Sequence, residues 1–143
     1  MDFSRFGALI FDCDGTLTHS MPLHFIAWRE TMARYGVDFP EADFYAMAGM
    51  PSDKVIRTLA DRQGVEVDVE KAMDEKEDLF LENLHQLRPL DYTVSLAREY
   101  SGKKPLAVAS GGTLPIVRAQ LEHLCIFGLF DAIVTAEHTE KHK

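Results

Sequence analysis

The sequence predicts an α/β protein in which a parallel sheet is interrupted by an inserted all-α subdomain. Three short apolar runs bounded by turn residues are typical of strands buried in a parallel sheet. These runs occupy residues 7–11, 105–109 and 131–136. Segments of helical periodicity separate them, and strands separated by helices pair in parallel through right-handed crossovers.

Four consecutive helical segments follow the first strand. The first carries Phe25, Trp28 and Met32 at helical spacing, and we expect this stripe to be buried. In the third segment, Ser52 is a candidate cap at the start and Gly64 a stop at the end. The second, third and fourth segments are expected at residues 40–49, 52–64 and 68–87.

The chain then returns to an alternation of helix and strand. Asp91 is expected to cap a helix before the second strand, and a further helix is expected at residues 114–124. The four-helix block is too long for an ordinary crossover between neighbouring strands. We therefore expect a helical subdomain of residues 18–87, inserted into a sheet core made of residues 1–17 and 88–143.

Composition limits the classes of function. The 143 residues are 46% hydrophobic and 27% charged, as in globular proteins, and carry a net charge of -8. This acidity argues against a nucleic-acid partner, although a local site can still bind a small phosphorylated ligand. No apolar run is long enough to span a bilayer, and the N-terminal residues lack a signal-peptide pattern. Two cysteines make no disulfide framework, so we expect a cytoplasmic protein without a membrane partner. The oligomeric state is not predicted.

The most informative stretch is FDCDGTLT, residues 11–18, in which two carboxylates follow directly after the first strand. Asp12 and Asp14 would repel each other unless a cation or different roles relieve the repulsion. Asp12 is a candidate nucleophile and Asp14 a candidate acid and base. Oxygen ligands of this kind suit Mg²⁺, so the same two residues are the candidate metal ligands.

This stretch has three other interpretations. An Asp-Gly turn after a strand is common and needs no function. A calcium-binding EF-hand loop counted from Asp12 would need glycine and an acid where the sequence has Leu17 and Leu23. A nucleophilic Cys13 would need a basic neighbour, but the adjacent residues are acidic, which favours a shielded structural thiol.

A second polar group follows the second strand, in the sequence AVASGGT. Ser110 is followed by Gly111 and Gly112 and then by a helix, so hydroxyl and backbone N–H groups could bind an anion there. Alone, this pattern is equally consistent with a plain strand-to-helix turn. Because parallel strands bind ligands beyond their carboxyl ends, we expect Ser110 to lie near Asp12 and Asp14.

Together, FDCDGTLT, the helical insertion and AVASGG resemble the haloacid dehalogenase superfamily. The resemblance is to the branch with a small helical cap, which contains beta-phosphoglucomutase and related sugar phosphatases. It implies a Rossmann-like core, with Asp12 forming an aspartyl phosphate. It further implies that Asp14 is the acid and base and binds Mg²⁺ through its carbonyl oxygen. Ser110 and the Gly111 amide would hold the transferring phosphoryl group.

The resemblance also identifies a charge-neutralising lysine, and Lys143 lies at the matching offset; the alternative is a plain terminal lysine. A further acidic motif that completes the family's metal site does not occur in these 143 residues. We therefore expect the sequence to be a shortened form with weak Mg²⁺ binding and little activity, and a product extended past Lys143 to be active.

In the helical subdomain, the resemblance suggests substrate contacts. His24 matches a histidine of the mutase branch, and Gly49 could allow close backbone approach. Lys76 could also reach a substrate, but a solvated helix lysine is the alternative. The candidate substrate residues are Ser20, His24, Gly49, Lys54 and Lys76.

The sequence therefore favours a Mg²⁺-dependent phosphatase that acts on a small phosphorylated metabolite, such as a sugar phosphate. A hexose-phosphate mutase of the beta-phosphoglucomutase type is the alternative within the same fold. A mutase needs a second phosphate clamp, best made by arginine, but Ser52 stands at the matching place. His19 also replaces an aspartate that many relatives carry. A catalytically silent binding protein with this fold is the third possibility.

Overall fold

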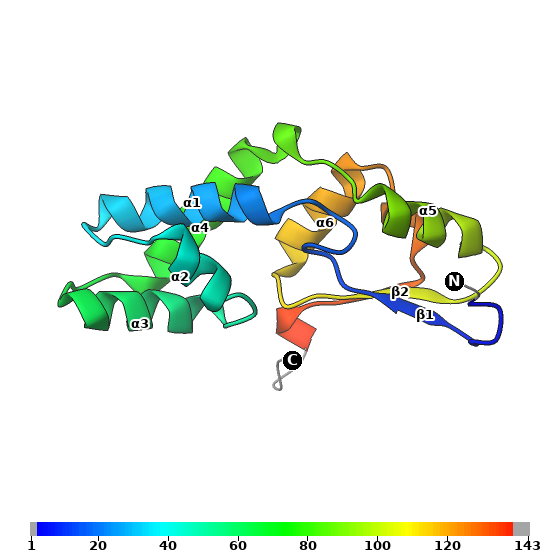
Figure 1. The fold of residues 1–143 in the computed structure, drawn as a ribbon, viewed down its shortest axis with the longest axis horizontal. Helices are drawn as coiled ribbons and strands as arrows, with labels where there is room; N and C mark the ends of the chain where they lie inside the picture. Colours follow the sequence, from blue (N-terminus) through cyan, green and yellow to red (C-terminus); the bar gives the residue numbers. More distant parts are fainter. Residues whose placement is uncertain (1–2, 139–143) are drawn as a thin grey trace. The chain divides into compact units, whose positions relative to one another are not determined.

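The computed structural model describes residues 3–138 and contains a three-stranded parallel sheet in the order β1-β2-β3 (Figure 1). Pairing places Phe11 beside Val108, and Val108 beside Ile133. The predicted α/β class with a parallel sheet is confirmed. The strands are β1 (Leu9–Phe11), β2 (Leu106–Ala109) and β3 (Ala132–Val134).

The helices follow the predicted order: five α-helices lie between β1 and β2, and the first four of them form the inserted block. Among the described residues, the α-helices are α1 (Met21–Arg34), α2 (Glu41–Ala46), α3 (Ser52–Gln63), α4 (Val69–Glu82), α5 (Asp91–Tyr100) and α6 (Leu114–His123). Short 3-10 helices lie at Leu84–Gln86, Phe127–Leu129 and Ala136–His138. None of the helices in this part of the chain is long and apolar enough to cross a bilayer.

The described chain divides into two compact units, which we consider separately: residues 3–20 with 86–138, and residues 21–85. In the first unit, which contains the sheet, one sheet face packs against α5 and α6. Buried side chains of β1 and β2 meet those of the two helices in a single apolar cluster. The buried residues of this cluster include Phe11, Leu106 and Val108 from the strands, Val94 and Ala97 from α5, and Val117 and Leu121 from α6.

The opposite sheet face is solvent-accessible in the described part of the chain. Alternate residues of a strand point to opposite faces. The register therefore places Ile10, Ala107 and Ala132 in one row of this second face. Ile10 is 73% exposed, and Val134 on the same face is 44% exposed. The expectation of strands buried on both sides is wrong here, because the helices of the cluster cover only the other face.

In the second unit, the aromatic stripe of α1 packs inside a helical core. Trp28 is 6% exposed and Met32 is fully buried. The expectation that this stripe forms core is therefore confirmed. Phe39 and Phe44 lie beside them in the same cluster and contact each other edge-on, at 6.1 Å between ring centroids.

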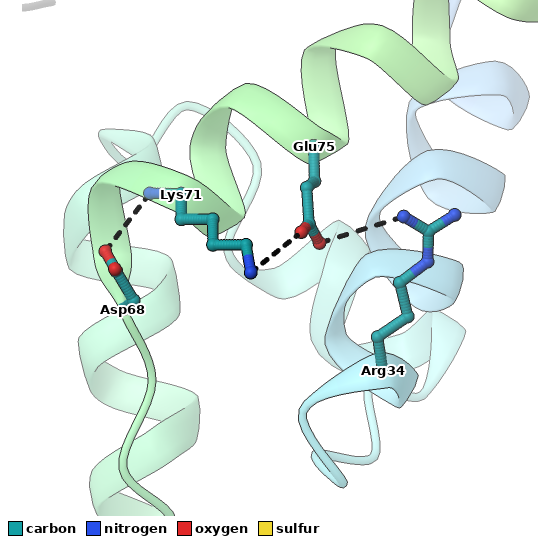
Figure 2. A network of polar contacts seen from close by, with 4 residues as sticks. All are labelled: Arg34, Asp68, Lys71 and Glu75. Atoms are coloured by element: carbon teal, nitrogen blue, oxygen red, sulfur yellow. Dashed lines mark hydrogen bonds and ion pairs between the residues drawn. The ribbon is translucent and has the colours of Figure 1, made fainter.

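Polar contacts at the surface join α1 to α4 within this unit (Figure 2). Glu75 of α4 lies 3.7 Å from the Arg34 guanidinium of α1 and 3.8 Å from the Lys71 ammonium one turn earlier. The Asp68 side chain accepts a hydrogen bond from the Lys71 N–H and caps α4. Exposed pairs of this kind contribute little stability, about 0 to 1 kcal/mol each.

The helix ends differ from the sequence predictions in four places. The second helix ends at Ala46, earlier than expected. Ser52 and Asp91 are not caps: each is the first helical residue, and Pro51 and Leu90 precede them without a side-chain capping bond. The fourth helix ends at Glu82, earlier than expected, and a 3-10 turn follows it. The predicted stop at Gly64 is confirmed, since its φ of +67° is the left-handed conformation that glycine adopts without strain.

Candidate active site

The first element of the site is a tight loop after β1, centred on Cys13. The N–H groups of Thr16, Leu17 and Thr18 all donate to the Cys13 carbonyl oxygen, at 3.2, 2.9 and 3.1 Å. Gly15 permits the turn with a φ of +73°. Cys13 is fully buried, which fits a structural thiol. The loop is thus anchored at the residue between the two candidate carboxylates.

The Asp14 carboxylate is held by two side chains, and a third side chain supports one of them. Its Oδ1 atom accepts a hydrogen bond from Ser20 Oγ at 2.6 Å and another from Gln120 Nε2 at 3.0 Å. Gln120 Oε1 in turn accepts from Thr18 Oγ1 at 2.7 Å. Ser20, Thr18 and Gln120 are fully buried. Hydrogen bonds to a carboxylate are stronger than neutral ones, so this network fixes the orientation of Asp14.

Two of these partners were not predicted, and the third was assigned to another role. Ser20 was expected among the helical-subdomain residues, but it precedes α1, groups with the sheet unit and donates to Asp14. The sequence alone assigns no role to Thr18 or Gln120. One sequence feature could have indicated a role for Gln120: it is a polar residue on an otherwise apolar helix face, beside Val117 and Leu121.

The second element is the Ser110 loop after β2. Ser110 is 7% exposed, and its Oγ accepts a hydrogen bond from the Gly112 N–H at 3.0 Å. A Cβ atom added to Gly112 would lie 3.4 Å from Ser110 Oγ and 3.7 Å from Asp14 Oδ2. The Asp14 carboxylate and the Ser110 loop therefore lie side by side at the carboxyl edge of the sheet. Gly111 is exposed, and an added Cβ there would meet nothing within 4 Å.

Segments after β3 brace this loop. The Ala136 N–H donates to the Gly112 carbonyl oxygen at 3.1 Å. Glu137 caps α6 from 23 residues away, because its Oε1 accepts from the Leu114 N–H at 2.8 Å. Its other oxygen accepts from the Thr135 hydroxyl at 2.7 Å. Partial burial acts to raise the pKa of Glu137, but these hydrogen bonds and the nearby His138 outweigh it and lower the pKa overall.

Replacing Glu137 by glutamine is expected to destabilise the fold slightly, because a neutral amide caps a helix start less well. The exposed position limits the loss to about 0.5 kcal/mol. Since the folded pKa lies below the ordinary 4.5, the advantage of Glu137 is present above pH 4.5 and disappears as pH falls through the folded value. Urea denaturation of both proteins at pH 7 and pH 3 checks this; an equal difference at both pH values would contradict it.

In the helical unit, Lys76 is buried at 7% exposure, so the alternative of a solvated lysine is wrong. Its ammonium lies 3.2 Å from His24 Nδ1 and over the rings of Trp28 and Phe80, at 5.4 and 5.7 Å. The His24 ring stacks on Phe80 at 4.2 Å. When Lys76 is protonated its ammonium can only donate, and Nδ1 of His24 is then the acceptor. These contacts gather Lys76, His24, Trp28 and Phe80 in one cluster within this unit.

The remaining predicted residues differ in their surroundings. Lys54 is exposed on α3, and Gly49 is an exposed glycine with a φ of +86°, three residues after the end of α2. Lys143 lies outside the described residues. Asp12 is partly exposed directly after β1, and its Oδ1 accepts from the Cys13 N–H at 2.9 Å.

The donor set at the sheet edge suits a hard cation. Mg²⁺ is commonly held by one or two carboxylates together with water and substrate phosphate. Asp12 and Asp14 supply oxygen ligands of this kind. The described residues contain no group of three or more His, Cys, Asp or Glu side chains that could form a larger metal centre.

Comparison with known proteins agrees with this arrangement. Residues 9–143 match the family described as haloacid dehalogenase-like hydrolase. The chain is 31% identical, over 99% of its own length and 75% of the relative's, to the fructose-1-phosphate phosphatase YqaB of Escherichia coli strain K12. It is 28% identical to an uncharacterized protein of Haemophilus influenzae, over 99% of this chain and 71% of that one.

Solved structures share the fold. The structure of CbbY from Rhodobacter sphaeroides in complex with phosphate superposes with a TM-score of 0.84 at 23% identity, over 96% of this chain and 66% of that one. Beta-phosphoglucomutase from Clostridium difficile gives a TM-score of 0.83 at 21% identity, over 96% of this chain and 65% of that one. The chain thus spans slightly less than two thirds of these structures. With the family match covering nearly all of its sequence, the chain belongs to the haloacid dehalogenase-like hydrolases.

Proposed function

We propose that the protein is a Mg²⁺-dependent phosphatase that hydrolyses a small phosphorylated metabolite, with a sugar phosphate as the preferred class. The observation that carries this proposal is the side-by-side position of the Asp14 carboxylate and the Ser110 loop, 3.7 Å from Asp14 Oδ2 to the Cβ position of Gly112. This position supports the pairing of Asp14, as the proposed proton-transferring group, with the Ser110 loop, as the proposed anion-binding loop. The relatedness to a fructose-1-phosphate phosphatase supports the substrate class.

The reaction follows from the roles of the two carboxylates. An oxygen of Asp12 attacks phosphorus and forms an acyl phosphate, while the bond from phosphorus to the sugar oxygen breaks. Asp14 donates a proton to the leaving oxygen. In the second half, Asp14 takes a proton from water as the water attacks phosphorus, which releases phosphate and regenerates Asp12. The Ser110 hydroxyl and the Gly111 N–H bind the phosphoryl oxygens.

Asp12 and the Asp14 carbonyl would hold Mg²⁺, which when bound neutralises negative charge on the phosphoryl oxygens. The proposed division of labour assigns the sheet unit, residues 3–20 with 86–138, to phosphoryl transfer. We assign the helical unit, residues 21–85, to substrate recognition, with Lys76 and His24 as the main candidates because their polar nitrogen atoms suit an anionic or hydroxylated substrate.

We favour a phosphatase over a mutase because a mutase must grip a bisphosphate at both ends. Ser52, the first residue of α3, occupies the position at which a mutase would carry the arginine. The nearby Lys54 is exposed. A lysine recognises phosphate as a point charge and lacks the two-pronged geometry of arginine. Lys54 alone would therefore not form a second phosphate-binding site, which would need further cationic side chains.

The experiment that tests the function uses a panel of sugar phosphates, including fructose 1-phosphate, with the full-length protein and Mg²⁺. We expect release of inorganic phosphate without any bisphosphate primer. Activity that depends strictly on a bisphosphate, with isomerised sugar phosphate as product, would instead establish the mutase. A protein that binds Mg²⁺ and sugar phosphates but releases no phosphate would establish the silent binding protein.

A further inference from the structure

We propose that Gln120 is a positioning residue that holds the Asp14 carboxylate in the orientation needed for proton transfer. This inference rests on the proposed phosphatase function. Gln120 lies on α6 and Asp14 in the loop after β1, 106 residues apart, and the Gln120 Nε2 atom donates to Asp14 Oδ1 at 3.0 Å. The contact therefore joins two separate elements of the sheet unit at the reacting group.

The burial of Gln120 indicates that its amide has a specific task. The side chain is fully buried, and the other buried residues of α6 are Ile116, Val117 and Leu121. An amide placed in such surroundings destabilises the fold unless its polar atoms are hydrogen-bonded. Both ends of the Gln120 amide are bonded, to Asp14 and to Thr18. A leucine would fill this helix face without these requirements.

The orientation of the amide is determined by its neighbours. Asp14 Oδ1 accepts hydrogen bonds whether the carboxyl group is ionised or carries its proton on Oδ2, so the NH₂ group of Gln120 faces Asp14. The Oε1 atom then faces Thr18, whose hydroxyl donates to it at 2.7 Å. Thr18 therefore acts through Gln120, by preventing the amide from turning over.

The same geometry distinguishes the two oxygens of Asp14. Oδ1 accepts from both Ser20 and Gln120. Oδ2 lies on the side of the Ser110 loop, 3.7 Å from the Cβ position of Gly112. Oδ1 is thus held by two side chains, and Oδ2 faces the loop at which phosphate would bind. Loss of Gln120 would let the carboxylate rotate, and a misplacement of about 1 Å can reduce a rate by about 10²-fold.

The test compares Gln120→Leu, Gln120→Met and Thr18→Val with the wild type in the full-length protein. A sugar phosphate needs a proton on its leaving oxygen, whereas p-nitrophenyl phosphate has a leaving group that departs without one. We expect kcat/KM for the sugar phosphate to fall about 10- to 100-fold in both Gln120 variants. For p-nitrophenyl phosphate we expect kcat/KM to stay within about 3-fold, since this constant reports only the steps up to the first irreversible one.

Thr18→Val should give a smaller loss in the same direction, and combining it with Gln120→Leu should add little, because both changes act on one contact chain. Leu121→Val is the matched control, since it alters the adjacent buried residue of α6 and leaves Gln120 in place. Leu121→Val should either leave kcat/KM unchanged for both substrates or lower it by the same factor for both. Equal losses for both substrates in the Gln120 variants would overturn the proposal.

A readout independent of activity separates this inference from the proposed function. We expect crystal structures of Gln120→Leu and Gln120→Met to show the Asp14 carboxylate rotated or in several orientations, and the wild type to show one. An unchanged Asp14 side chain in both variants would overturn the positioning role even if the wild type is active. If the wild type releases no phosphate, the proposed function fails, and the orientation of Asp14 still decides the role of Gln120.

Discussion

Replacement of Asp12 by asparagine is expected to abolish phosphate release, with a fall in kcat of at least about 10⁴-fold, which is the size of effect that follows removal of a catalytic nucleophile. An amide oxygen is a poor nucleophile and would not form a stable acyl phosphate with the substrate. The substitution keeps the shape of the side chain, and its acceptor oxygen can still bind the Cys13 N–H. We therefore expect the fold to remain intact.

Phosphate release by purified Asp12→Asn, measured beside its thermal unfolding, checks this prediction. Asp78→Asn is a matched control, since it removes one carboxylate from an exposed position of α4. The control should keep wild-type activity. Turnover by Asp12→Asn above about 1% of wild type, in a preparation free of deamidated protein, would remove Asp12 from the role of nucleophile.

Replacement of Asp14 by asparagine is expected to lower kcat/KM by different factors for substrates with different leaving groups. For a sugar phosphate, kcat/KM should fall about 10²- to 10⁴-fold, because the leaving oxygen receives no proton. For p-nitrophenyl phosphate the loss should be less than about 10-fold. The amide oxygen of the variant can still accept from Ser20 and Gln120, so the loop should keep its conformation.

The same variant should accumulate phosphoenzyme, since no base remains to activate water in the second half of the reaction. A rapid-quench experiment with p-nitrophenyl phosphate should show a burst of nitrophenol close to one equivalent, followed by slow turnover. Equal losses of kcat/KM for both substrates and no burst would show that Asp14 has no part in proton transfer.

Much of the fold could be predicted because its signals are local. Apolar runs predicted the buried strands around Phe11 and Val108, and helical spacing predicted the buried stripe of Trp28 and Met32. Each pattern lies in the same short segment as the structure that it predicts. The rule that parallel strands bind ligands at their carboxyl ends also brought Asp14 and Ser110 together correctly, although they are far apart in sequence.

The parts that could not be predicted depend on partners distant in the chain. Gln120 contacts Asp14 across 106 residues, and Glu137 caps a helix that begins 23 residues earlier. The burial of Lys76 depends on His24 and Trp28, which come from another helix. The exposure of Ile10 follows from both sheet-covering helices lying on the other face, which strand composition does not encode.

The central claim is that Asp12 carries the phosphoryl group, and chemical trapping of the intermediate tests it most directly. The full-length protein and Asp14→Asn are mixed with a sugar phosphate or p-nitrophenyl phosphate, quenched within milliseconds and reduced with borohydride. Borohydride converts an aspartyl phosphate to homoserine, which mass spectrometry of the digested protein locates. We predict homoserine at position 12, in larger amount in Asp14→Asn and absent without substrate. Phosphate release with a phosphorylated residue elsewhere, or with no covalent intermediate in either protein, would contradict this account.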